Sequence, residues 1–211
     1  CLICILLYTT ISLLAYKIIM KHNKEGIVLN GMYYLWKNGY HASGINDILN
    51  SCGIPKGSFY HLFDTKEDFC IEALDLYCNI MHTSMEEYLH DKSFVPFERI
   101  KNFYMNQIEQ SFDEGQIRGC YMCNLALELG TSSKKIRKEI TQHLATNLTL
   151  LEKCFTEAEN KGMLNELLSP FQAAELMQNN WFGALLRTKA TGKVEPLNEF
   201  LIGTFDILES E

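Results

Sequence analysis

The sequence predicts an all-α protein, with an N-terminal three-helix region of helix-turn-helix type followed by a larger helical domain. Apolar residues recur every three to four positions through most of the chain, which is the spacing of amphipathic helices. Only 4 prolines and 13 glycines interrupt the 211 residues, so long helices are easy to accommodate. No stretch alternates apolar and polar residues for long enough to indicate a strand. We therefore expect about nine helices after residue 20 and no strand.

The composition is that of a globular chain, with 47% hydrophobic and 21% charged residues. The net charge is −7, but residues 21–70 carry five lysines and five acidic residues and are neutral. If the chain binds nucleic acid, this N-terminal part must do so, because the remainder is acidic. The eight cysteines are scattered through apolar helical patterns, as expected of buried or reactive thiols in a reducing compartment. This favours a cytoplasmic protein.

Residues 1–19 form an apolar segment of their own. Residues 1–16 carry no charge, and three lysines follow by residue 24. The length just reaches that of a membrane helix with a cytoplasmic basic flank, whereas a signal peptide fits poorly because no cleavage site follows. Two other interpretations are open: a buried helix, or upstream sequence read in frame before a true start at Met20. We favour the start at Met20.

The first predicted helix covers residues 24–38, and Gly39 stands where a left-handed C-cap belongs. Ser43 is the expected N-cap of a short second helix that ends before Cys52-Gly53. Pro55 suits the first position of a third short helix ending near Phe63, because proline lacks the N–H that is unpaired there. A longer helix begins at about residue 64. We therefore expect a DNA-binding domain over residues 20–68 and a second domain over residues 69–211.

The second domain is also predicted to be helical throughout. Apolar periodicity and capping residues predict helices over residues 96–114, 120–129, 136–162, 171–190 and 194–208. Gly162 and Gly192 are the expected ends of the third and fourth of these helices.

Two short helices joined by a tight glycine-containing turn suit the DNA major groove, because the second helix can lie in the groove while the first crosses the backbone. The second helix presents small or polar side chains: Lys56, Gly57, Ser58 and His61. Lys56 and Ser58 can hydrogen-bond to base edges, and Tyr60 and Lys66 follow where phosphates would run. An ordinary helical hairpin with a solvated polar face would show the same spacing.

The identities of the residues in this region favour DNA binding over an ordinary hairpin. The run Ile48-x-x-x-Cys52-Gly53-Ile54-Pro55-Lys56-Gly57-Ser58-Phe59-Tyr60-His61-x-Phe63-x-x-Lys66-Glu67 closely resembles the signature of the TetR family. Leu49 and Pro55 depart from that pattern, and Lys21 and Lys24 supply the basic residues that many members carry before the first helix. The resemblance implies DNA contacts by Ser43, Lys56, Ser58, Tyr60, His61 and Lys66.

The resemblance also implies a homodimeric repressor that binds double-stranded, palindromic operator DNA and releases it when an effector occupies the second domain. The last two helices would pair with their copies in a four-helix bundle. No metal-ligand cluster, phosphate loop or nucleophile elbow occurs in the sequence, so we expect neither an enzyme nor a cofactor. The alternative is a helical adaptor that keeps the scaffold but binds protein.

The segment Gly119–Glu128 resembles the GC-x-x-x-N-x-x-x-E stretch of relatives of the N-ethylmaleimide-responsive repressor, some of which sense electrophiles through a cysteine. Cys120 is expected at a helix N-terminus beside Arg118, and both features stabilise a thiolate. Simple burial of the thiol is the main alternative. A zinc site would need two more ligands, and a thioredoxin-like site would need a βαβ unit. The predicted effector-binding residues are Cys120, Cys123, Asn124 and Trp181, of which Trp181 also suits core or interface packing.

Overall fold

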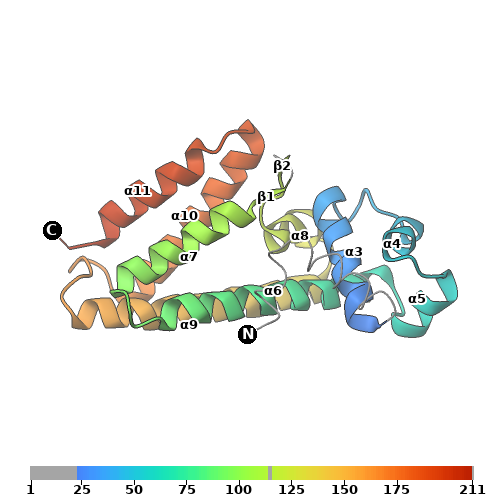
Figure 1. The fold of residues 1–211 in the computed structure, drawn as a ribbon, viewed down its shortest axis with the longest axis horizontal. Coiled ribbons are helices and arrows are strands. Elements are labelled where there is room, and N and C mark those ends of the chain that lie inside the picture. Colours follow the sequence, from blue (N-terminus) through green and yellow to red (C-terminus); the bar gives the residue numbers. More distant parts are fainter. Residues whose placement is uncertain (1–22, 114–115, 211) are drawn as a thin grey trace. The chain divides into compact units, whose positions relative to one another are not determined.

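The computed structural model describes residues 23–113 and 116–210, and this part of the chain is almost entirely helical (Figure 1). The expectation of an all-α fold is confirmed. The described residues contain nine helices, α3 to α11, and one pair of two-residue strands. The apolar segment over residues 1–19 lies outside the described residues, and so does a start at Met20. Within the described ranges, no helix combines the length and the hydropathy that crossing a membrane requires.

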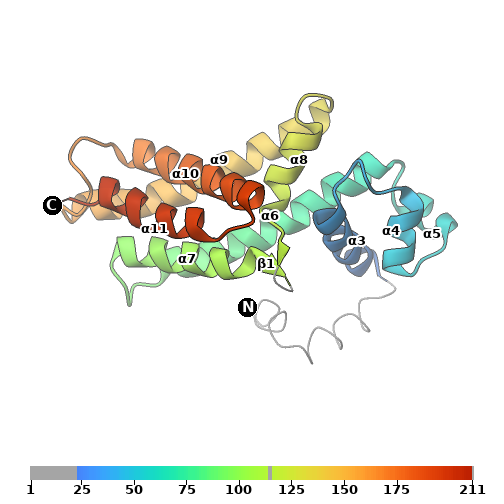
Figure 2. The same cartoon turned by 90° about the horizontal axis from the view of Figure 1, so that it is seen from above.

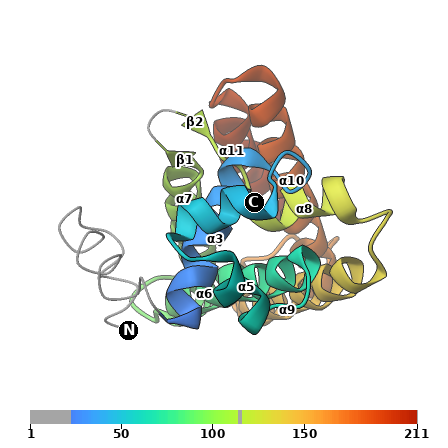
Figure 3. The same ribbon diagram turned by 90° about the vertical axis from the view of Figure 1, so that its right-hand side faces the viewer.

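The chain forms two compact units, and the first comprises residues 23–81 and 124–140 among those described. It contains three short helices that lie around the start of α6 (Figures 1 and 3). The domain boundary predicted after residue 68 stays a prediction, since these units group the chain by compactness alone. The helices of this unit are α3 (Lys24–Asn38), α4 (Ile45–Cys52), α5 (Lys56–Leu62), the first part of α6 (Lys66–His90), most of α8 (Tyr121–Leu129) and the start of α9 (Lys134–Asn160).

The first helix has the predicted bounds because both of its ends are capped locally. The Asn23 side chain accepts a hydrogen bond from the Gly26 N–H at 2.8 Å, which pairs one of the free donors of the first turn. At the other end Gly39 has a φ of +85°, as expected, but a ψ of 158°. The chain therefore leaves α3 extended rather than in the left-handed helical conformation that we predicted.

Two predicted caps are wrong by one residue. The N-cap of α4 is Gly44, whose N–H donates to Asp47 Oδ2 at 2.7 Å, and not Ser43. Ser43 is buried and donates its hydroxyl to the Gly39 carbonyl oxygen at 2.6 Å, so the hydroxyl is not available to cap α4. Pro55 is the N-cap of α5, which begins at Lys56. The left-handed C-cap of α4 is Gly53, with φ 67° and ψ 34°.

An aromatic cluster forms the core beneath the helix-turn-helix. The rings of Phe59, Phe63 and Phe69 lie 5.0 to 5.5 Å apart, and all three side chains are buried. Gly31 lets α3 pack directly on this cluster, because a Cβ at Gly31 would lie 2.3 Å from Phe69 Cζ and 3.2 Å from Ile48 Cγ2. The cluster thus joins α3, α5 and α6.

The second unit comprises residues 82–123 and 141–210 of the described chain. The last two helices pack on each other, and α11 packs on α7, as Figure 2 shows. Gly162 and Gly192 follow the ends of α9 and α10 with φ values of 67° and 69°, as the sequence predicts. The helices of this unit are the end of α6, α7 (Pro96–Gln110), the first residues of α8, most of α9, α10 (Pro170–Thr191) and α11 (Glu195–Leu208).

The segment after α7 differs from the prediction. We expected a helix to residue 114, but α7 ends at Gln110 and a short antiparallel pair follows, β1 (Phe112–Asp113) with β2 (Gln116–Ile117). The pairing is extended by the Arg118 N–H, which donates to the Ser111 carbonyl oxygen at 2.9 Å. The next helix, α8 (Tyr121–Leu129), begins one residue after Cys120, the first residue that we predicted for it. Within residues 23–113 and 116–210, the expectation of no strand is therefore wrong for these four residues.

A buried arginine on α7 forms an ion pair with a glutamate on α9 within the second unit. The Arg99 side chain is fully buried and forms an ion pair with Glu157 at 2.6 Å, and Lys92 pairs with the same carboxylate at 2.6 Å. Arg99 also donates to the Leu89 carbonyl oxygen. The two cations hold the pKa of Glu157 at about 2, well below its usual 4.5, because their hydrogen bonds stabilise the charged carboxylate.

Candidate nucleic-acid interface

The orientation of α5 is set by one buried side chain, Phe59. Its ring is fully buried and lies 5.1 Å from that of Phe63 and 5.5 Å from that of Phe69. Because Phe59 is the buried residue of this seven-residue helix, most of the other positions face outward, and only Leu62 among them is half-buried. The predicted contact residues of α5 are accordingly all exposed: Lys56, Gly57, Ser58, Tyr60 and His61.

Lys56 and Tyr60 form one part of this exposed face. The Lys56 ammonium lies 5.8 Å from the centre of the Tyr60 ring, within the range of a cation–π contact. Gly57 lies beside them, and no atom is found within 4 Å of the position where a Cβ would be. This part of the helix combines a cation, a phenol and a backbone position without a side chain. A base-pair edge or a phosphate can therefore approach the helix closely here.

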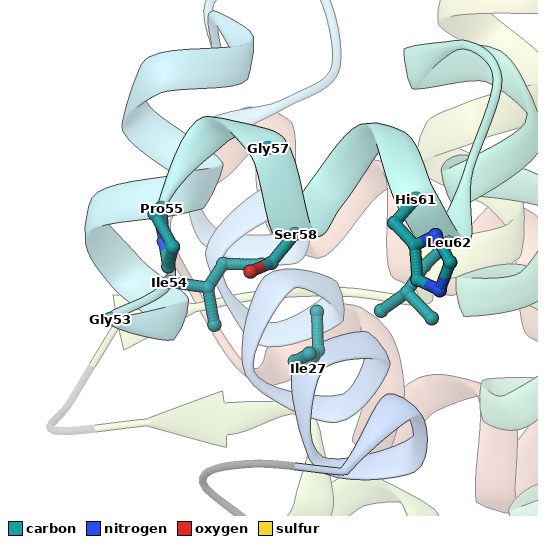
Figure 4. A pocket seen from close by; sticks show the side chains of 8 residues that line it. All are labelled: Ile27, Gly53, Ile54, Pro55, Gly57, Ser58, His61 and Leu62. Carbon is teal, nitrogen blue, oxygen red and sulfur yellow. The ribbon is translucent and has the colours of Figure 1, made fainter.

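Ser58 and His61 lie on the side of α5 that faces α3 (Figure 4). Both line an open cavity of about 470 Å³, together with Ile27 of α3 and the turn residues 53–55. Figure 4 shows their side chains on one side of α5, above Ile27. The cavity is lined mainly by apolar atoms, and Ser58 and His61 are the lining residues with polar side chains.

Lys66 already has partners within the chain. Its ammonium donates to the backbone carbonyl oxygens of Tyr40 and Ser43 and lies 3.9 Å from the centre of the Tyr40 ring. Partial burial lowers the pKa of Lys66, and nearby negative groups such as Glu128 oppose that shift. The phosphate contact predicted for Lys66 therefore stays a prediction, whereas its contact with the loop after α3 is observed. The Ser43 hydroxyl is likewise turned away from solvent.

The basic residue at the start of α3 is partly neutralised. Lys24 forms an ion pair with Glu72 at 2.7 Å, and its ammonium lies 5.4 Å from the centre of the Phe63 ring. Lys21, the other basic residue noted before the first helix, lies outside the described residues.

The predicted effector residues fall into two environments. Cys120, Cys123 and Asn124 are half-buried at the entry to α8 and in its first turn. Trp181 is buried on α10 and packs against Tyr104 at 5.2 Å and Phe200 at 5.3 Å, as the packing interpretation expects. Among the residues that the structure describes, no three His, Cys, Asp or Glu side chains lie close enough together to hold a metal ion.

Sequence reasoning missed two side-chain contacts. The rings of His82 and His143 lie 5.5 Å apart, although the histidines are scattered along the chain. Glu128, the last residue of the motif around Cys120, accepts hydrogen bonds from the backbone N–H groups of Tyr40 at 3.0 Å and His41 at 2.8 Å. Partners more than 60 residues apart leave no local pattern, so only the fold reveals them.

Comparison with known proteins decides the family. Residues 32–73 match the sequence model described as "Bacterial regulatory proteins, tetR family", and residues 96–203 match "Tetracyclin repressor-like, C-terminal domain". The second match alone covers half of the chain. The chain belongs to the tetR family.

Relatives of this TetR-family regulator match along most of their length. The HTH-type transcriptional repressor DhaR of Mycobacterium sp. (strain GP1) is 30% identical over 185 residues, which cover 88% of this chain and 91% of DhaR. The crystal structure of the reduced form of Escherichia coli NemR has a TM-score of 0.81 at 26% identity and covers 89% of this chain and 97% of that one. The regulatory protein TetR from Rhodobacter sphaeroides also has a TM-score of 0.81, at 29% identity, covering 86% and 96%.

These matches extend over both the helix-turn-helix and the domain that follows it. The TetR-family chain is therefore a DNA-binding transcriptional regulator with a helical effector domain, and its relatives are regulators rather than enzymes. Regulators of this family bind operator DNA and act as dimers.

Proposed function

We propose that this regulator is a cytoplasmic repressor that binds a palindromic operator as a homodimer and leaves it when an effector occupies the second domain. The observation that carries the proposal is the exposed face of α5, which the buried Phe59 ring fixes in place. Two relatives, DhaR and NemR, are named transcriptional repressors, which supports repression rather than activation.

The exposed residues of α5 divide into two roles in this proposal. Lys56 and Ser58 read base edges, and Gly57 lets the helix approach them closely. Tyr60 and His61 contact the sugar-phosphate backbone at the rim of the groove. For the DNA contacts predicted at Ser43 and Lys66, each polar group has to leave or share the backbone carbonyl oxygens that it binds in the free chain.

The dimer is proposed to form through α10 and α11. Each of these helices exposes a large aliphatic side chain, Leu186 with 54% and Ile202 with 66% of its surface accessible. Gly183 and Gly203 lie close by in sequence, and no atom lies within 4 Å of where a Cβ would stand at either glycine, so a second pair of helices can approach closely. Pairing these faces about a two-fold axis gives a four-helix bundle, and a two-fold dimer matches the symmetry of a palindrome.

The effector is proposed to be a small molecule, with an electrophile as the specific candidate. Cys120 immediately precedes the first residue of α8, where the helix dipole favours a thiolate. A maleimide reports on this chemistry, since the thiolate adds to its double bond and the neighbouring carbon takes a proton from water. Cys154 offers a contrast, because burial raises the pKa of its thiol to about 11.

The test begins with selection of bound duplexes from genomic fragments. Affinity for the selected operator should fall steeply as salt rises, by roughly a thousandfold between 50 and 200 mM if about six phosphates are contacted. A helical adaptor that binds only protein would select no duplex.

The second arm of the test treats the protein with limiting N-ethylmaleimide, maps the modified cysteine by mass spectrometry and measures operator release. Cys120→Ser should keep operator binding and lose release, while Cys154→Ser should behave as the unchanged protein does. Modification of another cysteine first, or normal release by Cys120→Ser, would reject thiol sensing. The effector would then be a non-covalent ligand bound near Asn124 or Trp181.

A further inference from the structure

The loop between α3 and α4, residues 39–44, is held by side chains from distant parts of the sequence. Glu128 of α8 contacts it through both carboxylate oxygens: Oε1 accepts from the Tyr40 N–H at 3.0 Å, and Oε2 accepts from the His41 N–H at 2.8 Å. The Glu128 carbonyl oxygen also lies 3.2 Å from His41 Nε2. One residue of α8 thus binds two consecutive peptide groups of the loop.

A cation holds the same loop from α6. The Lys66 ammonium donates to the carbonyl oxygens of Tyr40 and Ser43, so the negative side chain binds N–H donors and the positive one binds carbonyl acceptors. Both are charge-assisted hydrogen bonds, the stronger class in proteins. We call Glu128, Lys66 and residues 39–44 the loop clamp.

The backbone of the loop leaves space for the carboxylate. At Gly39 a Cβ would lie 3.1 Å from Glu128 Oε1, and the φ of +85° also disfavours a side chain there. The loop ends at Gly44, the N-cap of α4, and α4 is joined to α5 by the tight turn at Gly53. The position of the loop therefore sets where the helix-turn-helix begins.

We propose that Glu128 is a positioning residue that couples α8 to the DNA-binding helices through the loop clamp. This inference rests on the proposed function, because α8 starts directly after Cys120 and ends at Leu129, one residue beyond Glu128. A displacement at the start of α8 is carried along the helix to Glu128 and passed to α4 and α5 through the hydrogen bonds to Tyr40 and His41.

Coupling of this kind is reciprocal, so operator DNA alone can test it. If an effector acting on α8 changes DNA affinity through the loop clamp, DNA binding must change the stability of α8 through the same contacts. The experiment measures amide hydrogen exchange in the full-length protein, with and without a selected operator duplex. Amides in α4, α5, the loop and the last turn of α8 are compared among the unchanged protein, Glu128→Ala and Glu128→Gln.

In the unchanged protein, the duplex should slow exchange in α5 and also in the last turn of α8. In Glu128→Ala, the Tyr40 and His41 amides should exchange roughly tenfold faster without DNA, the scale of losing a hydrogen bond to a charged group. The duplex should still protect α5 in this variant but no longer α8. Glu128→Gln keeps one acceptor oxygen and should restore part of the protection of α8. Glu159→Ala, which removes an exposed carboxylate from α9, should match the unchanged protein.

The outcomes separate this inference from the proposed function. Failure of the duplex to protect α5 in the unchanged protein would contradict the proposed DNA binding. Equal protection of α8 in the unchanged protein and in Glu128→Ala, with α5 protected in both, would overturn the coupling role of Glu128. Unchanged exchange at Tyr40 and His41 in Glu128→Ala would overturn the loop clamp itself, whether or not DNA binds.

Discussion

Gly31 makes the close packing of α3 testable by a single methyl group. In Gly31→Ala the new Cβ would lie 2.3 Å from Phe69 Cζ, far inside van der Waals contact. Phe69 has little room to move away, because its side chain is fully buried and its ring packs against Phe59 at 5.5 Å and Phe63 at 5.0 Å. The substitution must therefore shift α3 or distort the aromatic cluster.

Two opposing effects set the magnitude. Replacing glycine by alanine inside a helix favours folding by about 1 kcal/mol. Overpacking a core costs about 1 to 3 kcal/mol, and a contact as short as this one belongs at the upper end of that range. We expect Gly31→Ala to lower the free energy of unfolding by about 2 kcal/mol, and the melting temperature by roughly 4 to 8 °C for a chain of this length.

Urea unfolding at one fixed protein concentration measures the effect, because dimerisation would otherwise shift the midpoint. Gly57→Ala is the matched control: the same substitution in the same unit, but with no atom within 4 Å of the new Cβ. It should be as stable as the unchanged protein or up to about 1 kcal/mol more stable. If Gly31→Ala were equally stable, or if both variants lost the same amount, the packing argument would be refuted.

Three further predictions concern DNA reading, assembly and acid stability. Lys56→Ala should relax base preference by about 1 to 3 kcal/mol at one position, whereas Tyr60→Phe should weaken binding equally on all sequences; a panel of mutated operators distinguishes the two. Ile202→Glu should shift the protein toward monomers in sedimentation at micromolar concentration, and an unchanged dimer would argue against the α10 and α11 interface. Because the pKa of Glu157 is depressed, its stabilising effect is present above pH 4.5 and lost as the pH falls toward 2. Glu157→Gln should therefore lower stability at pH 7, by less than the full pKa shift implies because 39% of the Glu157 side chain is exposed and solvent screens the pair, and should flatten the decline in acid, as followed by circular dichroism.

Helix ends were predictable where their determinants are local. Gly162 and Gly192 lie two residues after the end of α9 and one residue after the end of α10. Their positive φ values are incompatible with a right-handed helix, so neither helix can continue through them. The start of α4 was missed because two residues compete there. Ser43 has the side chain of a good N-cap, but Asp47 already pairs with the Gly44 N–H, and the Ser43 hydroxyl turns back to Gly39.

The exposed residues of α5 were predictable because the motif is contiguous and Phe59, the buried residue within α5, fixes the outward positions. The roles of Lys66 and Glu128 were not, because both depend on the backbone of residues 39–44. Nothing near Glu128 in the sequence indicates that its partners lie 87 and 88 residues away. Ionic contacts with the backbone carry even less sequence signal than pairs of side chains, since any residue supplies an N–H or a carbonyl.

The division of α5 into one fully buried ring and an exposed surface has a consequence for how operator specificity can change. Phe59 anchors the helix, while a Cβ at Gly57 would meet open space, Lys56 is exposed, and Tyr60 is 45% exposed with its ring edge-on to Phe59 at 5.6 Å. Substitutions at these three positions keep the three buried rings of the aromatic cluster, and most exposed substitutions alter stability by about 1 kcal/mol or less. Descendants of this gene could therefore acquire new target sites by drift at positions 56, 57 and 60 while the same folded scaffold is inherited unchanged.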